Sequence, residues 1–549
     1  MNDAIKYEAV HCTERQLVIP TYPVQAADLN PMFFENRVYQ GSSGKVYPNP
    51  FTDRVALEKV DATYRAIFIE NEYIQVILLP EIGGRIFAGL DKTNHYDFFY
   101  RQHVIKPALV GLLGPWISGG VEFNWPQHHR PSTFMPVHTA IERDAEGGCT
   151  VWLSEHDPML RMKGMVGIHL SPGKAIVEAR VRLYNRTPVT QTFLWWANVA
   201  VRAHDQYQAF FPPDVTFVAD HAKRAISTYP IARNRYYGVD YSPGTDISWY
   251  KNIPVPTSYM VTESKYDFCG GYDHGAEAGV VHTSNHRVAP GKKLWTWGNA
   301  EFGYAWDRNL TDQDGPYVEL MAGAYTDNQP DFSWLQPYET KRFSQFWYPI
   351  QKIGPAKNAN TEAAVNLEFS QQQVSVGVCV TSKRTVRVQL THNRLPVFDR
   401  ELGLAPGQPL TASIERADAR PEDFELSVLD QDGRALIAYR PEVHIDREIP
   451  GPATEPPPPE QIRSTDELYL TGVHLEQYRH ATRSPEAYWR EGLKRDPDDA
   501  RLNNAMGLRS LRIGRLAAAE EHFVRAIRRL TARNPNPYDG EAFYYLGLV

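Results

Sequence analysis

The segment 118–130, SGGVEFNWPQHHR, combines a carboxylate, an amide, an indole and two imidazoles with two adjacent glycines. Glycine lets a backbone approach a ligand closely. Indole faces can stack against the apolar side of a sugar ring, and amide and imidazole groups exchange hydrogen bonds with hydroxyls. Taken singly, each aromatic residue is better explained as part of a hydrophobic core. As a group they predict a carbohydrate site, whose substrate-binding residues are Asn124, Trp125, His128 and His129 of this segment and Trp116 just before it.

Hydrolysis of a glycosidic bond needs two carboxyl groups, and the chain offers two candidates. One group stays protonated and donates to the leaving oxygen, while the other acts as base or nucleophile. Glu122 lies in the segment above, and Glu319 lies far along the chain in YVELMAG. We predict that they face one cleft as a catalytic pair. The sequence leaves open which is the acid, and a solvated or salt-bridged strand carboxylate is the alternative for either.

Metal binding is the sharpest competing interpretation of the same segment. His128, His129 and Glu122, together with His138 and the segment 155–157, could supply nitrogen and oxygen ligands. Adjacent residues on an extended strand point to opposite faces, so at most one of the paired histidines normally binds a given ion. No HExxH, GxSxG, P-loop or GxGxxG spacing occurs. The sequence therefore predicts neither a metal nor another cofactor.

The elements that must position these groups are β-strands. Between residues 60 and 350 short alternating or β-branched runs follow one another, separated by turn residues, as in YRAIFIENEYIQVILLP, TVWLSEHD and AIVEARVRLYNRTP. Such spacing is typical of an all-β sandwich or barrel. The stretch is too long for an immunoglobulin-sized domain, which favours a super-sandwich of two large antiparallel sheets. The predicted fold class is therefore mainly β with a C-terminal α region.

The order of patterns predicts five segments. Residues 1–60 are a largely extended part that packs on the main domain, and residues 61–352 form the carbohydrate-active β-super-sandwich. Residues 353–448 have turn signals every eight to twelve positions, which is typical of a small β-sandwich. Residues 449–464 are a stiff, proline-rich linker, and residues 465–549 are helical.

The helical segment resembles the tetratricopeptide repeat, in which paired helices stack into a solenoid. A second repeat starts at GEAFYYLGLV and stops within it, so we expect a truncated solenoid. The resemblance implies a protein partner or self-association through these helices. The matching residues are Tyr488, Leu493, Pro497, Leu502, Gly507, Gly514, Ala519, Phe523 and Ala526.

Three segments of the β region resemble the aldose-1-epimerase, or galactose mutarotase-like, superfamily. They are IQVILLPEIGGRIFAGLD, NRTPVTQTFLWWANVAV and the run from YVELMAG to FSQFWYPI. With the helices behind it, the chain resembles a bacterial family of mutarotase-like domains that carry C-terminal tetratricopeptide repeats. The resemblance implies a sugar site in which Arg85, after the glycine pair, and Asn198 contact the ligand.

In that superfamily a Glu removes the anomeric hydroxyl proton and a His protonates the ring oxygen. Glu319 matches the strand of the Glu, but matching without gaps puts Leu194 where the His belongs. Simple mutarotation therefore lacks its acid. Trp195 and Trp196 are expected to divide between core and cleft, with Trp196 toward the substrate. The loop TWGNAEFGYAWDRNLTD supplies Trp306 and Asp307 as further predicted substrate contacts.

Composition excludes several other classes. The net charge is −7 with no basic run, which argues against nucleic acid. The four cysteines lie far apart, without a CxxC pair, as in a reducing compartment. No signal peptide is visible, and the most apolar run is interrupted by Pro and Gly, so a cytoplasmic protein without membrane contact is predicted.

The sequence thus favours a glycoside hydrolase acting on an oligosaccharide or glycoside through Glu122 and Glu319. Two alternatives stay open. One is a carbohydrate-binding sensor or scaffold without catalysis. The other is a sugar epimerase that takes its histidine from another strand, with His128 as the candidate.

Overall fold

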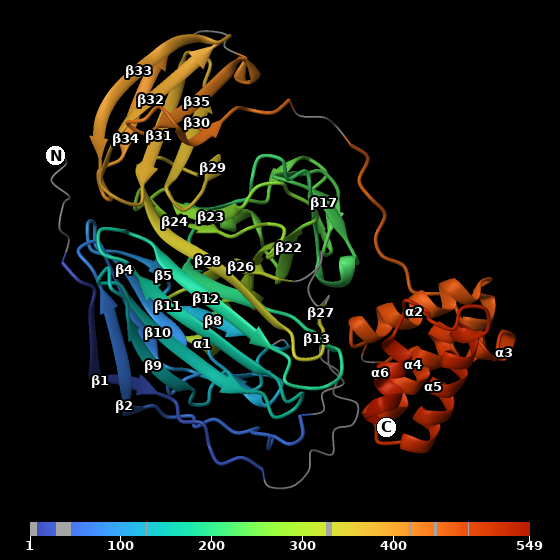
Figure 1. Cartoon of the computed structure of the whole chain (residues 1–549). Coiled ribbons are helices and arrows are strands. Elements are labelled where there is room, and N and C mark those ends of the chain that lie inside the picture. The colour runs from blue at the N-terminus through green and yellow to red at the C-terminus, as the bar shows by residue number, and fades with distance from the viewer. Residues whose placement is uncertain are drawn as a thin grey trace. The chain divides into compact units, whose positions relative to one another are not determined.

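A computed structural model describes residues 8–28, 46–127, 129–324, 332–416, 420–443, 447–480 and 482–549. These residues form two compact units, one ending at Ala453 and one running from Thr454 to the end of the chain. The first unit is built mainly of strands and the second of helices, as Figure 1 shows. The prediction of a mainly β chain with a C-terminal α region is therefore confirmed. The five segment boundaries proposed from the sequence stay predictions.

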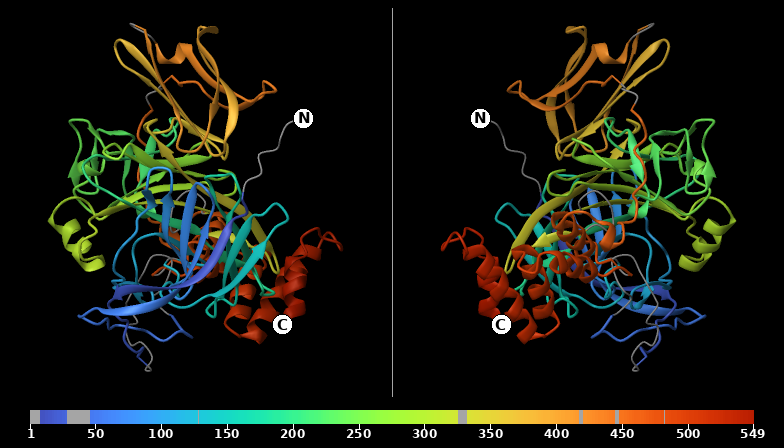
Figure 2. Two further views of the ribbon diagram at one scale, coloured as in Figure 1. Left: turned by 90° about the vertical axis from the view of Figure 1, so that its left-hand side faces the viewer. Right: turned by 90° about the vertical axis from the view of Figure 1, so that its right-hand side faces the viewer.

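The larger sheet of the first unit is antiparallel and begins with β1, which pairs with β2 along its full length. In Figure 2 the blue strands from the N-terminal part of the chain lie side by side in this sheet. In the described residues its twelve strands run in the order β1 (His11–Thr21), β2 (Val60–Glu70), β3 (Ile74–Leu79), β4 (Arg85–Asp91), β8 (Val121–Asn124), β14 (Trp196–Arg202), β26 (Tyr317–Gly323), β25 (Gly291–Thr296), β22 (Thr257–Val261), β16 (Phe217–Ala219) and β17 (Ile226–Thr228), with β5 (Tyr96–Phe99) paired to β4.

A second antiparallel sheet contains eight strands in the described part of the chain. Their order is β15 (Tyr207–Phe210), β23 (Phe268–Asp273), β24 (Ala278–Thr283), β28 (Thr340–Gln351), β12 (Val177–Tyr184), β11 (Lys163–Leu170), β10 (Cys149–His156) and β9 (His138–Arg143). Shorter paired strands are β6 (Ala108–Gly111) with β7 (Gly114–Trp116), β13 (Gln191–Phe193) with β27 (Ser333–Leu335), β18 (Ile231–Ala232) with β21 (Thr245–Asp246), and β19 (Arg235–Tyr236) with β20 (Val239–Asp240).

One hydrophobic core joins the two large sheets. Val121 and Phe123 of β8 and Val199 of β14 belong to it from the larger sheet, and Val151 and Ile168 belong to it from the eight-stranded sheet. Strand side chains alternate between faces. The residues between these core positions therefore lie on the other face of the larger sheet, and this is the face that carries the candidate site.

One segment predicted as a loop is a helix. The aromatic-rich sequence after Thr296 contains α1 (Glu301–Leu310). Trp306 and Leu310, four residues apart, share one side of a helix and pack in one apolar cluster with Tyr317. Gly303 permits this packing, since a Cβ there would lie 1.9 Å from the Gly298 carbonyl oxygen. The prediction was wrong because the burying contacts come from residues distant in sequence.

The rest of the first unit is a smaller pair of four-stranded sheets that share a core of their own. One sheet is β29 (Asn358–Ala359), β30 (Ala363–Phe369), β31 (Gln373–Val380) and β34 (Leu410–Glu415). The other is β33 (Leu395–Leu404), β32 (Arg384–His392), β35 (Phe424–Leu429) and β36 (Ala435–Tyr439). We call these two sheets the small sandwich.

The second unit holds five α-helices in the residues described, coloured red-orange in Figure 1. They are α2 (Thr465–Gln477), α3 (Pro485–Arg495), α4 (Ala500–Arg512), α5 (Leu516–Thr531) and α6 (Glu541–Leu548). Asp499 is the N-cap of α4, and its side chain accepts hydrogen bonds from the backbone N–H groups of Arg501 and Leu502. Their assignment as tetratricopeptide repeats stays a prediction. Among the described residues no helix has the length and apolarity that a membrane span requires.

Candidate active site

Strand pairing puts the two predicted catalytic carboxylates on one face of one sheet. Asn198 of β14 lies opposite Glu122 of β8, and Ala200 of β14 lies opposite Glu319 of β26. Asn198 and Ala200 are two positions apart, so all of these side chains share a face. Only β14 separates the two carboxyl-bearing strands, which sets their backbones about 10 Å apart across the sheet.

The same face carries polar groups on both sides of this pair. Ile86 of β4 pairs with Val121, which gives Arg85 the same orientation as Glu122. On the other side, Lys293 of β25 pairs with Met321 of β26. We call this set the polar row, and every member is buried. Its members are Arg85, Glu122, Asn124, Trp196, Asn198, Glu319 and Lys293.

Glu122 is saturated with hydrogen-bond donors. Its Oε2 accepts the Trp116 indole N–H at 3.0 Å and lies 3.1 Å from His129 Nδ1, while its Oε1 accepts the Thr133 hydroxyl at 2.5 Å. Burial alone raises the pKa of this carboxyl. A charged His129, the Arg85 guanidinium and the Thr133 hydroxyl together outweigh burial and hold the pKa well below its ordinary value. Glu122 is therefore an anion throughout the neutral range.

Arg85 holds the glycine-containing loop, and the charge of Glu122 acts on it. Its Nη1 donates to the carbonyl oxygens of Ser118 and Gly119 at 3.0 and 3.2 Å. Burial lowers the pKa of the guanidinium to about 10, although the charge of Glu122 opposes the shift. Gly120 has a φ of +60°, and a Cβ there would lie 1.9 Å from the Ile86 carbonyl oxygen. This glycine thus serves a close approach to β4, where the sequence suggested an approach to ligand.

Glu319 has the opposite electrostatic setting. Burial raises the pKa of its carboxyl above the ordinary value, and the charge of Glu122 adds to the shift. The charges of Lys293 and His129 and a hydrogen bond from Asn198 lower the pKa without cancelling the effect of burial. The Tyr317 hydroxyl donates to Glu319 Oε1 at 3.3 Å. The two carboxyl groups are thus driven apart in pKa, which is typical of acid/base pairs.

Sequence reasoning missed Lys293 and His221. Lys293 Nζ lies 3.0 Å from His221 Nε2, and His221 Nδ1 lies 2.8 Å from the Ser258 hydroxyl. Burial lowers the pKa of Lys293 to about 7 against the charge of Glu319, and lowers that of His221 well below its ordinary value. Two lysines inside the strand run GKKLWT were a signal that one of them is buried with a partner. His221 is the first residue of a short 3-10 helix, His221–Lys223, and gave no signal in the sequence.

Several buried polar atoms of the polar row have no hydrogen-bond partner among the described residues. They are Nε and Nη2 of Arg85, Nδ2 of Asn124 and Oδ1 of Asn198. An unsatisfied buried polar group costs about 1–3 kcal/mol, so each such atom in a native protein needs an explanation. A ligand with several hydroxyl groups could form hydrogen bonds with these donors and this acceptor, because hydroxyl groups both donate and accept.

Strand alternation divides the predicted aromatic contacts. Trp116 and Trp196 flank His129, with ring centroids 5.3 and 6.3 Å from the imidazole. Trp195 belongs to the core between the large sheets, whereas Trp196 is buried in a separate apolar cluster with Leu194 and Met321. A substrate contact of Trp196 stays a prediction. Trp125 follows the orientation of Phe123 and lies in the core against Phe193, so its prediction as a substrate contact is corrected. His128 lies outside the described residues.

Trp306 and Asp307 lie on α1, and Trp306 is connected to the site through packing. Trp306 stacks on Trp297 with ring centroids 4.2 Å apart, and the Trp297 N–H donates to the Tyr317 hydroxyl at 3.1 Å. Trp306 shares an apolar cluster with Trp116 and Tyr317. Asp307 Oδ1 is buried without a hydrogen bond in the described part of the chain, and burial raises the pKa of this carboxyl. Both residues stay predicted substrate contacts.

Metal ligation was the competing interpretation of this segment. Across the described residues no three His, Cys, Asp or Glu side chains come together in an arrangement that could hold a metal ion. His129 pairs with Glu122 and packs between two indoles.

Replacing Lys293 by methionine should move the acidic limb of the pH–rate profile to higher pH for any reaction on the polar row that needs ionised Glu319. The Lys293 charge lowers the pKa of Glu319, so its removal raises that pKa and the carboxylate forms only at higher pH. Lys292→Met is the matched control, because Lys292 is also buried but lies on the opposite face of β25. A pH–rate profile that moves equally in both variants, or in neither, would show that the charge of Lys293 does not control the pKa of Glu319.

Comparison with known proteins matches two parts of the chain to families. A family model described as "Domain of unknown function (DUF5107)" matches residues 42–350, and one described as "YphG-like protein, second domain" matches residues 358–439. The first covers more than half of the chain.

Among solved structures, a TPR-domain containing protein from Parabacteroides distasonis is similar over 99% of this chain and 77% of its own, with 17% identity and a TM-score of 0.56. This likeness shows that the fold is shared. Galactose mutarotase-like proteins from Clostridium acetobutylicum and Lactobacillus casei are 10% and 9% identical, with TM-scores of 0.36 and 0.34. Each match covers 52% of this chain, and 96% and 100% of theirs.

Proposed function

The chain belongs to the DUF5107 family, and we propose that its β unit binds a sugar on the polar row and opens and closes the sugar ring at the anomeric carbon. The proposed activity is that of an aldose 1-epimerase. Its substrate class is a free aldose, which carries the anomeric hydroxyl that the reaction needs.

One observation carries the binding part of the proposal. Arg85, Asn124 and Asn198 present buried donors and an acceptor without partners in the described chain, all on the face that holds Glu122 and Glu319. A sugar offers hydroxyl groups that both donate and accept, so it would satisfy all of them. Trp196 lies among them and supplies an aromatic surface for the apolar side of the ring.

The carboxyl environments assign the catalytic roles. Glu319 is the general base, because a carboxylate whose pKa is raised accepts a proton more readily near neutrality. His129 is the general acid. Glu122, anionic and hydrogen-bonded to Trp116, His129 and Thr133, acts as a positioning residue that holds the His129 ring in place. In this proposal the missing family histidine at Leu194 is replaced from the loop after β8, by the neighbour of the His128 suggested by the sequence.

In the proposed step, Glu319 and His129 take up and supply all the protons that are transferred. Glu319 takes the proton of the anomeric hydroxyl while protonated His129 gives a proton to the ring oxygen, and the bond between the anomeric carbon and that oxygen breaks. The open aldehyde turns about its adjacent carbon–carbon bond. Ring closure then returns both protons in the reverse sense, leaving the inverted anomer and the starting enzyme.

Glycoside hydrolysis is the second candidate, favoured by the opposite pKa shifts of the two carboxyls. In that case Glu319 would be the acid and Glu122 the base or nucleophile. The hydrogen bonding of Glu122 favours the epimerase instead, because both of its oxygens already accept donors from Trp116, His129 and Thr133. A nucleophile or base needs a lone pair directed at the substrate.

The test is a pair of assays on the full chain. Exchange NMR should show accelerated interconversion of the two anomers of free hexoses, and a panel of glycosides of different linkage should yield no free sugar. Release of sugar from any linkage would favour hydrolysis. Saturable sugar binding with neither activity would support the non-catalytic sensor or scaffold.

His129→Gln should lower kcat/KM for anomer interconversion by about 10²-fold, because general-acid catalysis supplies an effect of that order. Sugar affinity should change far less. His11→Gln, at an exposed position on β1, serves as the control. Equal rates in the two variants would remove His129 from the mechanism.

The partner predicted for residues 465–549, a second protein or another copy of the chain, is likewise a proposal. Exposed apolar side chains on α5 and α6 support it, among them Leu516, Val524 and Phe543. A cytoplasmic location and the absence of nucleic-acid and membrane partners also stay predictions from composition.

A further inference from the structure

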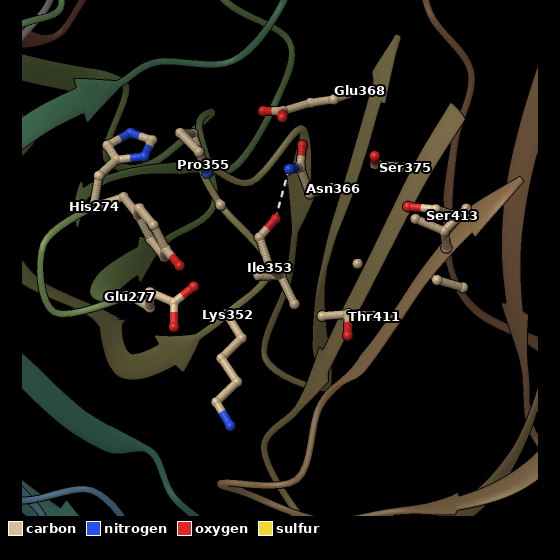
Figure 3. A pocket seen from close by; sticks show the side chains of 15 residues that line it. His274, Glu277, Lys352, Ile353, Pro355, Asn366, Glu368, Ser375, Thr411 and Ser413 are labelled. Atoms are coloured by element: carbon tan, nitrogen blue, oxygen red, sulfur yellow. Dashed lines mark hydrogen bonds between the residues drawn. The ribbon is translucent and has the colours of Figure 1, made fainter. Parts of the chain in front are cut away.

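A hollow of about 410 Å³ lies at the small sandwich, away from the polar row (Figure 3). Its floor is the outer face of β30, β31 and β34, and its wall comes from the loop 352–355 and the turn 272–277. Floor and wall are held together by an apolar cluster that includes Tyr272, Ile353 and Ala364. The volume is in the range of sites that bind small molecules.

The floor is made of small and polar residues because of strand register. Asn366 of β30 lies opposite Gly377 of β31, which lies opposite Thr411 of β34. One step along, Glu368, Ser375 and Ser413 form a second row in the same way. Gly377 lets the wall come close, since a Cβ there would lie 2.7 Å from Ile353 Cβ.

Asn366 gives the hollow a fixed polar group that is incompletely satisfied. Only 4% of this residue is exposed. Its Nδ2 donates to the Ile353 carbonyl oxygen at 2.5 Å, which orients the amide and binds floor to wall. Its Oδ1 has no hydrogen-bond partner in the described chain. A buried acceptor of this kind calls for a donor from a ligand or water.

Other polar side chains also line the hollow. The hydroxyls of Ser375, Thr411 and Ser413 line it. Figure 3 shows Glu277 on the opposite side from Ser375 and Ser413, with Lys352 below it. His274 completes this side, its ring stacked on Trp249 at 4.8 Å and its Nε2 2.9 Å from Gln208 Oε1.

We propose that this hollow binds a neutral saccharide, as a second carbohydrate site separate from the polar row. The hydroxyl groups of a sugar both donate and accept hydrogen bonds. They can therefore pair with the carboxylates of Glu277 and Glu368, which only accept, with the ammonium of Lys352, which only donates, and with the hydroxyls of the floor. Glu277 and Glu368 repel an anion, while Lys352 repels a cation. An apolar ligand would leave Asn366 Oδ1 unsatisfied.

The experiment locates binding by hydrogen-exchange mass spectrometry of the full chain with glucose, galactose, mannose, maltose and cellobiose. At least one sugar should slow exchange in peptides covering residues 363–380 and 410–415. Protection limited to the peptides around residues 118–130 would overturn the second site and leave the proposed function standing. Protection limited to the small sandwich would leave the second site standing and overturn the proposed sugar binding on the polar row.

Ser413→Trp tests the hollow itself. Ser413 is exposed on the floor, so an indole there fills the hollow without disturbing the core, and binding should weaken by at least about tenfold. Ser427→Trp is the matched control, because Ser427 lies on β35 in the other sheet of the small sandwich. Glu368→Gln, which removes a charged acceptor, should weaken binding by about tenfold.

Three results would overturn the proposal. One is unchanged protection of the floor peptides in Ser413→Trp. Another is an equal loss of binding in Ser427→Trp. The third is protection of the same peptides by calcium chloride alone, which would identify a cation site.

Discussion

Glu319→Gln is expected to lower kcat/KM for anomer interconversion by about 10²–10⁴-fold, the range that general-base catalysis contributes. Glutamine keeps the size of the side chain and can still accept a hydrogen bond from Tyr317, but it cannot take a proton at neutral pH. Sugar affinity should stay within a few-fold, because Arg85, Asn124 and Asn198 keep their free hydrogen-bonding groups. Exchange NMR measures the rate, and saturation-transfer NMR measures the affinity.

Glu301→Gln is the control for this variant, because Glu301 is an exposed glutamate at the start of α1. The Glu319 variant should also lose the acidic limb of the pH–rate profile. That limb reports ionisation of a group whose pKa lies above that of an ordinary carboxyl. A variant that keeps wild-type turnover, or one whose acidic limb is unchanged, would show that another group is the base.

Strand alternation explains how much of this site the sequence could predict. The runs around Glu122 and Glu319 have apolar neighbours on both sides, so each carboxylate had to face away from a core. Pairing of both strands with β14 then brings them to one face. The same alternation separates Trp195 from Trp196.

Roles within the site could not be predicted, because they depend on contacts between distant segments. The Trp116 indole reaches Glu122 from β7, and the Thr133 hydroxyl reaches it from the turn after β8. With His129 and Arg85 close by, these contacts make Glu122 an anion, whereas the sequence left open which glutamate is the acid. Lys293 and His221 are in contact although they lie 72 positions apart in the sequence. Neither the depressed pKa of Glu122 nor the raised one of Glu319 follows from residue type, since burial acts on both.

Glu122→Gln is expected to lower the free energy of unfolding of the β unit by about 3 kcal/mol or more, because removing one partner of a buried charge pair costs about 3–5 kcal/mol. Arg85 is left buried without its counter-charge. An amide NH₂ must also face either the Thr133 hydroxyl or the Trp116 and His129 donors. Urea unfolding followed by tryptophan fluorescence measures the change, since every tryptophan except Trp489 belongs to the β unit.

A double variant and a pH series separate charge from packing. Adding Arg85→Met removes the stranded cation, so the two losses should sum to more than the loss in the double variant. The folded-state pKa of Glu122 lies below its ordinary value of 4.5, so its contribution is present above that pH and disappears as pH falls through the folded-state pKa. The stability gap between wild type and Glu122→Gln should therefore narrow as the solution is acidified below about pH 4.5. A gap independent of pH, with additive losses in the double variant, would mean that Glu122 stabilises the sheet by its shape alone and not by holding the charges of Arg85 and His129.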